Sequence, residues 1–453
     1  MWSLRVLVLT AACGLFSSVN AWKNTNLIRT YDLTKSYVKE TITIKLENDL
    51  QEAANVYTLM KDLVDDERVV SAVALEKTQG GSVSLDIVPS LTTEDGLDIR
   101  FPSPVLPGES KTIHVSLTLD GAQKPVPAKI KQDDQQYLVY RASKTFVSPY
   151  DTEKQRLKFK FPTNNVPSFT EFTDASGNKQ PARAGNTLTY ETLETVERDT
   201  PKELVSVRYE YTAPLPRARQ LDIEVDIHQF RKEISVVEKT TLENHAAELR
   251  GHFNRAKWAM SRFYNPLTAA LGSFRIYLPK DVRDVSFKDE DGNVTTSHMR
   301  ADRQHTVLDL IPRFPVFGGW NYYFRLAWNM ALDSFAADKN GRTVVTLPSM
   351  WSLEDALFSN VSWTLTLPEG AKDIKVNVPT ELSLKNVTTV YHFLDIQGRQ
   401  SFVYEASDVS DEFSQKVIEI SYVYDTLAHR LRLAVIVGII GVLFTAAYMI
   451  WAP

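Results

Sequence analysis

The chain has 453 residues, of which 43% are hydrophobic, so it is long enough for two or three folded domains. Its net charge is −5, and no long run of basic residues occurs, which argues against a protein that binds nucleic acid.

The N-terminus has the pattern of a cleaved secretory signal. Met1–Arg5 carries a positive charge, Val6–Phe16 is apolar, and small residues precede a cleavage site at Ala21. We therefore assign residues 1–21 to a signal peptide. The only cysteine, Cys13, lies inside it, so the mature chain has none and must be held by its core alone.

Two distant segments resemble each other and indicate a duplicated β architecture. Residues 37–48 (YVKETITIKLEN) and 233–244 (EISVVEKTTLEN) both alternate apolar and polar residues and end in Leu-Glu-Asn. Residues 205–211 and 418–424 share an alternating pattern with two tyrosines. The residues expected on the buried faces are Val38, Ile42, Ile44 and Leu46 in the first copy, and Ile234, Val236, Thr240 and Leu242 in the second.

Most of the remaining chain also alternates and is punctuated by Gly, Pro and Asp. The strands expected from this pattern include TIHVSLTLDG, YLVYRAS, RLKFKFP, TLTYETLE, TVVTLP and VSWTLTLPEG. Residues 46–67 contain a helix candidate with a loop as the alternative, and 245–266 are expected to be helical or irregular. The prediction is a mainly β protein with a few inserted helices. It has two tandem β-sandwich-like lumenal domains, 22–215 and 216–430, joined by a linker at 212–220.

Two aromatic segments each leave two interpretations open. Residues 255–265 include Trp258, Phe263 and Tyr264 among basic residues, which suits either core packing or contact with a partner or a membrane surface. Residues 313–330 include Phe317 and Trp320 around a double glycine. That segment suits a core strand pair after a tight turn, with a partner or peptide platform as the alternative.

The acidic triplet Asp289-Glu290-Asp291 resembles those that hold a metal and a sugar diphosphate in sugar transferases. Its neighbourhood lacks alternating strands and helices and a glycine-rich phosphate loop. The Asp291-Gly292 pair favours a hairpin turn, and similar turns recur at 172–179 and 393–400. We predict a hairpin here and no metal or cofactor.

Three Asn-x-Ser/Thr acceptors for N-linked sugar lie in the second half of the chain. They are Asn293, Asn360 and Asn386.

The C-terminal segment Leu433–Trp451 is apolar and uncharged. At about 1.5 Å per residue it spans roughly 28 Å, close to the hydrocarbon thickness of about 30 Å, so we predict a transmembrane helix. A cleaved signal places residues 22–430 in the lumen and leaves 452–453 as a minimal cytosolic tail, although Arg430 and Arg432 then oppose the positive-inside bias. The small residues Gly438 and Gly441 suit close packing on partner helices.

Four segments together resemble the ribophorin I family, subunit 1 of the oligosaccharyltransferase of the endoplasmic reticulum. They are residues 286–299 (SFKDEDGNVTTSHM), 311–324 (IPRFPVFGGWNYYF), 367–379 (LPEGAKDIKVNVP) and 391–399 (YHFLDIQGR). Residues 29–48 resemble the family more loosely, and the short tail resembles fungal members.

The resemblance implies a non-catalytic accessory subunit of a complex that transfers a preassembled glycan from dolichol diphosphate to Asn-x-Ser/Thr of nascent proteins. It implies residence in the endoplasmic reticulum membrane. It also implies that catalysis belongs to a multi-spanning partner subunit, with other small membrane subunits and nascent polypeptides as further contacts. This agrees with a sequence that has no HExxH, no Gly-x-Ser-x-Gly and no cysteine nucleophile after maturation. The alternatives are a type I adhesion or receptor ectodomain and a lumenal hydrolase.

Overall fold

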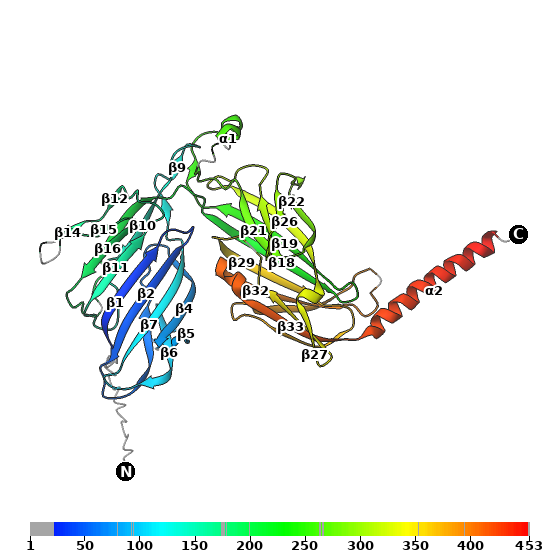
Figure 1. Cartoon of the computed structure of the whole chain (residues 1–453), viewed down its shortest axis with the longest axis horizontal. Helices are drawn as coiled ribbons and strands as arrows, with labels where there is room; N and C mark the ends of the chain where they lie inside the picture. The colour runs from blue at the N-terminus through cyan, green and yellow to red at the C-terminus, as the bar shows by residue number, and fades with distance from the viewer. Residues whose placement is uncertain are drawn as a thin grey trace, which may run out of the picture.

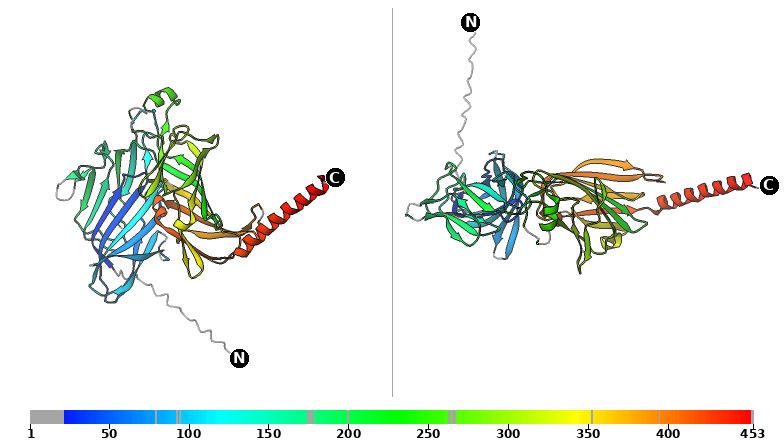
Figure 2. Two further views of the ribbon diagram at one scale, coloured as in Figure 1. Left: turned by 45° about the vertical axis from the view of Figure 1, so that its right-hand side comes forward. Right: turned by 90° about the horizontal axis from the view of Figure 1, so that it is seen from above.

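The computed structural model describes residues 22–78, 80–91, 93, 95–173, 177, 179–198, 200–261, 264, 267–351, 353–393 and 395–451. The predicted signal peptide and the two-residue tail lie outside this part. The described chain forms two β-rich bodies, and helix α2 (Thr426–Trp451) projects from the second body (Figures 1 and 2). The prediction of a mainly β fold with one C-terminal apolar helix is confirmed.

The first body packs a ten-stranded sheet against a four-stranded sheet. The large sheet has the order β15-β16-β11-β1-β2-β7-β4-β5-β6-β3, and the small one has the order β12-β17-β10-β8. The strands of the large sheet are β1 (Trp22–Asp32), β2 (Val38–Asn48), β3 (Ala54–Met60), β4 (Arg68–Thr78), β5 (Gly81–Pro89), β6 (Gly96–Val105), β7 (Ser110–Asp120), β11 (Gln155–Lys160), β15 (Ala182–Ala184) and β16 (Thr187–Thr192). Those of the small sheet are β8 (Lys124–Pro125), β10 (Tyr137–Ser143), β12 (Ser168–Phe169) and β17 (Leu204–Glu210). A further hairpin pairs β13 (Phe172–Thr173) with β14 (Lys179–Gln180).

The second body packs an eight-stranded sheet, of order β23-β22-β26-β19-β18-β29-β32-β31, against smaller sheets of orders β27-β28-β33-β30 and β21-β25-β24. The large sheet contains β18 (Pro216–His228), β19 (Glu233–Asn244), β22 (Arg283–Asp289), β23 (Gly292–Asn293), β26 (Asn321–Ala331), β29 (Leu357–Thr366), β31 (Ser383–Val390) and β32 (Arg399–Ser410). The smaller sheets contain β21 (Phe274–Pro279), β24 (His298–Ala301), β25 (His305–Leu310), β27 (Ala336–Lys339), β28 (Arg342–Pro348), β30 (Ala371–Asn377) and β33 (Val417–Tyr424). Short 3₁₀ turns lie at Leu332–Ser334 and Asp411–Gln415.

The two bodies share one strand order. The run β16-β11-β1-β2-β7 of the first large sheet matches β32-β29-β18-β19-β26 of the second. In each run the same pair is parallel, β1 with β11 and β18 with β29. The small sheets match as well, because β12-β17-β10-β8 corresponds to β30-β33-β28-β27. We propose from this correspondence that residues 22–215 and 216–430 are duplicated domains.

The alternating segments form strands as predicted, because period-two alternation puts apolar side chains on one face of a pleated sheet. The predicted inward residues of β2 and β19 are all buried, Thr240 included.

Two predictions are wrong. The helix candidate at 46–67 contains β3, where Tyr57 and Leu59 alternate into the core, and tertiary pairing overrides helix propensity. The predicted linker is shorter than 212–220, since residues 216–220 already belong to β18. In 245–266, helix α1 (Arg255–Ser261) forms as expected.

The junction between the bodies combines polar contacts with a small apolar patch, in which Ala246, Ala247 and Ala269 pack against the core of the first body. Arg217 of β18 binds Asp120 of β7 through both terminal nitrogens, at 3.0 and 2.7 Å. Tyr37 donates a hydrogen bond to Asp411 at 2.6 Å, and the short strands β9 (Lys129–Ile130) and β20 (Glu248–Leu249) pair in parallel. These contacts fix the second body relative to the first.

Candidate functional site

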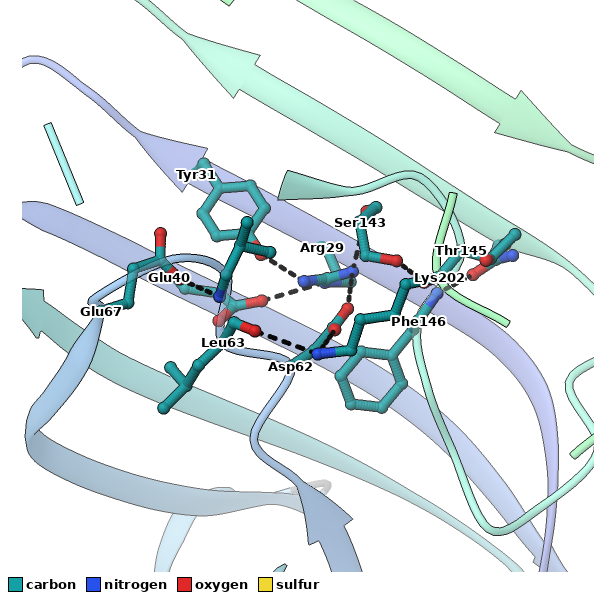
Figure 3. Close-up of polar contacts among 12 residues, drawn as sticks. Arg29, Tyr31, Glu40, Asp62, Leu63, Glu67, Ser143, Thr145, Phe146 and Lys202 are labelled. Carbon is teal, nitrogen blue, oxygen red and sulfur yellow. Dashed lines mark hydrogen bonds and ion pairs between the residues drawn. The ribbon is translucent and has the colours of Figure 1, made fainter. Parts of the chain in front are cut away.

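A fully buried charge cluster surrounds Arg29 of β1 in the first body (Figure 3). Its Nε donates to Glu40 at 2.9 Å, and one terminal nitrogen donates to Asp62 at 3.0 Å and to the Ser143 carbonyl at 3.2 Å. The other terminal nitrogen donates to the Tyr31 hydroxyl. Every face of the guanidinium is therefore occupied by the protein itself.

The Arg29 cluster is connected to solvent through one side chain. Lys202, whose side chain is 40% exposed, forms an ion pair with Asp62 at 3.0 Å. Nearby, burial raises the pKa of Glu67 to about 7. Because Arg29 is only 1% exposed, a ligand cannot reach it in the folded state, and we interpret the cluster as a device that joins β1, β2 and the loop around Asp62.

The acidic triplet lies in the predicted hairpin. Strands β22 and β23 pair Asp289 with Gly292, so Glu290 and Asp291 occupy the turn, one position earlier than expected. Arg313 donates to both oxygens of Asp289 at 2.8 Å. These hydrogen bonds hold the pKa of Asp289 below its usual value. In the described part of the chain, no three His, Cys, Asp or Glu side chains gather closely enough to hold a metal ion.

All three sugar acceptors are exposed and belong to the same eight-stranded sheet. Asn293 lies on β23 at one edge, Asn386 on β31 at the other edge, and Asn360 on the inner strand β29. A single row of directly paired residues crosses this sheet: Asn293, Lys288, Arg325, Lys239, Asp222 and Ser362.

Directly paired residues on neighbouring strands point to the same side of a sheet. Asn360 lies two residues before Ser362, and Asn386 reaches Thr364 through Val403, so all three acceptors share one face. The opposite face carries the core residue Trp363. The three acceptors therefore lie on the outward face of the second body.

Aromatic residues from two separate segments meet beside α1. Trp258 of α1 lies 5.9 Å from Phe317 between ring centroids, and Phe317 lies 5.3 Å from Trp320. Phe253 contacts Phe317 and Trp320. Of the other predicted contact residues, Tyr264 is 87% exposed, whereas Phe263 lies outside the described residues.

The segment before β26 is a loop at 311–320, so the expected strand pair does not form within 313–330, and its second half is the single strand β26. Gly318 is required there because a side chain would meet the Ala246 carbonyl at 2.2 Å. The loop buries Phe317 and leaves Phe314 37% exposed. Its residues 311–315 line a groove of about 910 Å³ together with Arg255 and Trp258.

Helix α2 contains the predicted span Leu433–Trp451, which is long and apolar enough to cross a membrane. A side chain added at Gly438 or Gly441 would meet nothing within 4 Å in the described chain. Both glycines are therefore open to helices of other proteins.

Comparison with known proteins decides the family. The family model described as Ribophorin I matches residues 22–451, which include every described residue. The chain belongs to the ribophorin I family. Among relatives of this ribophorin I family member, subunit 1 of dolichyl-diphosphooligosaccharide–protein glycosyltransferase from Schizosaccharomyces pombe is 39% identical over 100% of both chains. Subunit 1B from Oryza sativa subsp. japonica is 29% identical over 84% of this chain and 81% of its own length.

Solved structures give a much weaker likeness to this ribophorin I family member. A two-domain M1 zinc metallopeptidase superposes with a TM-score of 0.29 and 11% identity over 46% of this chain and 42% of its own. That similarity carries no argument about activity.

Proposed function

We propose that this chain is a non-catalytic subunit of an oligosaccharyltransferase complex of the endoplasmic reticulum, anchored by α2 with residues 22–430 in the lumen. The observation that carries the proposal is the full-length match to a relative named as subunit 1 of this glycosyltransferase. Catalysis then belongs to a multi-spanning partner subunit.

In this proposal the chain acts through its placement beside the catalytic subunit and not through chemistry of its own. Two β bodies fixed to each other through Arg217, Asp120, Tyr37 and Asp411 stand on one membrane helix. The two bodies, held rigidly beside the catalytic subunit, hinder escape of a nascent chain and so raise its local concentration near the active site.

The groove beside α1 is our candidate for contact with the acceptor polypeptide. Its apolar lining includes Trp258 and Phe314, and Arg255 and Arg313 flank it. Aromatic rings offer contact area that does not depend on one side-chain sequence, and arginines donate to backbone carbonyls. These properties suit an extended chain of variable sequence.

Co-purification tests the assembly. The full chain with an affinity tag, extracted in mild detergent, is expected to bring down a multi-spanning subunit that transfers glycan to an acceptor peptide. Gly438→Leu with Gly441→Leu should reduce that recovery several-fold, because bulk at these positions holds partner helices apart. Val442→Leu, a change at a 68% exposed site on the same helix, is the matched control.

A second measurement addresses catalysis. The tagged chain stripped of its partners is expected to transfer no glycan from a dolichol-linked donor, while the intact complex does. Transfer by the stripped chain would overturn the non-catalytic assignment. Recovery as a lone protein bearing glycans processed beyond the endoplasmic reticulum would instead favour a cell-surface receptor.

A further inference from the structure

We propose that two loops of the second body form a second membrane contact beside α2, one that inserts aromatic side chains among the phospholipids. The loops are the β18–β19 turn, with Phe230 and Arg231, and the β31–β32 loop, with Tyr391, His392 and Phe393. We call these two segments, residues 230–231 and 391–393, the lipid-facing loops. The inference rests on α2 as a membrane span and does not require the enzyme complex.

The position of the lipid-facing loops along α2 is the first argument. Phe230, Arg231, His392 and Phe393 line a pocket of about 540 Å³ together with Leu433 and Ile436 of α2. Leu433 is the first residue of the apolar span. Since an α-helix rises about 1.5 Å per residue, Ile436 lies about 4.5 Å deeper. Side chains that share a pocket with Ile436 are therefore level with the membrane boundary.

Composition is the second argument. The rings of Phe230, Tyr391 and Phe393 are 70%, 65% and 86% exposed, in a body whose other aromatic residues largely fill its core. Tyrosine concentrates at membrane–water interfaces, and phenylalanine buries its ring at the boundary between headgroups and acyl chains. Arg231 is exposed at the same turn, where a cation faces lipid phosphates, while its neighbour Lys232 is paired with Asp333 at 3.1 Å.

The lipid-facing loops are also held in place. Arg399, whose side chain is 9% exposed, binds Asp226 of β18 at 3.3 Å and Asp395 of the β31–β32 loop at 2.9 Å. Glu369 accepts hydrogen bonds from the backbone N–H groups of Ile396 and Gln397, both at 2.6 Å. A loop fixed this way keeps its exposed rings on the side that faces α2, where Figures 1 and 2 show the helix leaving the body.

The common level of the two loops along α2 favours lipid over a protein partner. Two separate loops present exposed rings at the level of Leu433 and Ile436 of α2, and Arg231 adds a cation on one of them, which is the geometry that a flat headgroup layer requires. A lumenal protein partner has no need for that common height. Such a partner is nevertheless an outcome that the test below distinguishes.

The test uses the mature chain, which has no cysteine once Cys13 is removed with the signal peptide. Phe230→Cys and Phe393→Cys are each labelled with an environment-sensitive nitrobenzoxadiazole dye, in the mature chain reconstituted into phosphatidylcholine vesicles. Leu193→Cys is the matched control, since Leu193 is 67% exposed on the first body. Alkaline extraction checks independently that α2 is inserted in every sample.

Lipids carrying a nitroxide near the headgroup are expected to quench the dye at positions 230 and 393 at least two-fold, and the dye at 193 hardly at all. Aqueous iodide should show the reverse order. Equal iodide quenching at all three positions, with α2 inserted, would overturn the proposal. Protection from iodide without quenching by lipid would also overturn it, because a protein surface would then cover the loops. Tyr391→Cys repeats the measurement if one of the first two variants misfolds.

Discussion

Asn48 and Asn244 make the same hydrogen bonds at equivalent places in the two halves. Each Nδ2 donates to two backbone carbonyls at 2.8–2.9 Å, and each Oδ1 accepts the N–H two residues later. The carbonyls of Asn48 and Asn244 in turn accept the N–H of Gly108 and Gly319, whose φ angles are 72° and 76°. The repeated Leu-Glu-Asn thus has a physical cause, since the asparagine closes the strand end.

We expect Asn48→Ala and Asn244→Ala to lower the free energy of unfolding by about 2–4 kcal/mol each, because each leaves buried carbonyls without a donor. Denaturant unfolding of the full chain in detergent measures this. Asn164→Ala, at an exposed loop position, is the control and should change stability by less than about 0.5 kcal/mol. Equal effects at all three positions would contradict the argument.

Arg29→Met should destabilise the first body by about 3–5 kcal/mol, because it leaves Glu40 and Asp62 buried without their cation. Lys202→Met removes a partly exposed partner of Asp62 and should cost about 1 kcal/mol or less. The same unfolding experiment compares the two. A milder effect for Arg29→Met than for Lys202→Met would show that the Arg29 cluster does not depend on its arginine.

Glu238 introduces a pH dependence in the second body. It is 1% exposed, its carboxylate accepts the backbone N–H of Trp351 at 3.2 Å, and burial raises its pKa to about 7. A raised pKa means that the folded state prefers the protonated acid. The contribution of Glu238 to the free energy of unfolding is therefore fully present below pH 4.5. It is lost as pH rises to 7, by an amount on the order of 3 kcal/mol. Glu238→Gln keeps the acceptor and should raise the unfolding midpoint at pH 8 but not at pH 4.5. A gain of the same size at both pH values would refute this.

The outward face of the eight-stranded sheet should carry the sugars. Asn293→Gln, Asn360→Gln and Asn386→Gln are each expected to remove one endoglycosidase-sensitive step in electrophoretic mobility. Asn386 lies on the edge strand β31, all of whose residues are exposed, so loss of its glycan should increase aggregation most. Asn377→Gln, outside any acceptor motif, serves as the control.

Asp289→Ala with Asp291→Ala should leave transfer of glycan to reporter proteins intact, because Asp289 forms an ion pair with Arg313 beside the hairpin turn. The double variant is expected to cost about 1 kcal/mol of stability, given that the ion pair is partly exposed. Normal assembly of the complex with abolished transfer would restore the metal-site interpretation.

Local alternation was sufficient to predict most strands and both repeated segments, because the period of two survives in each. It failed at β3, where Tyr57 and Leu59 lie among good helix formers, and only pairing with β6 decides the outcome. The Arg29 cluster was missed since its members come from residues 29, 40, 62 and 202, which no short pattern connects. The sequence did contain one indication of the cluster: Arg29 and Tyr31 are two residues apart and therefore both lie on the inward face of β1.

The parallel pairing of β1 with β11 also sets a schedule for biosynthesis. Residues 33–154 must be made before β11, the parallel partner of β1, is reached, which takes about 6–24 s at 5–20 residues per second. Meanwhile one edge of β1 stays open, and an open edge invites aggregation. The same delay recurs between β18 and β29. A polypeptide of this topology therefore exposes an unpaired strand edge twice during its own translation.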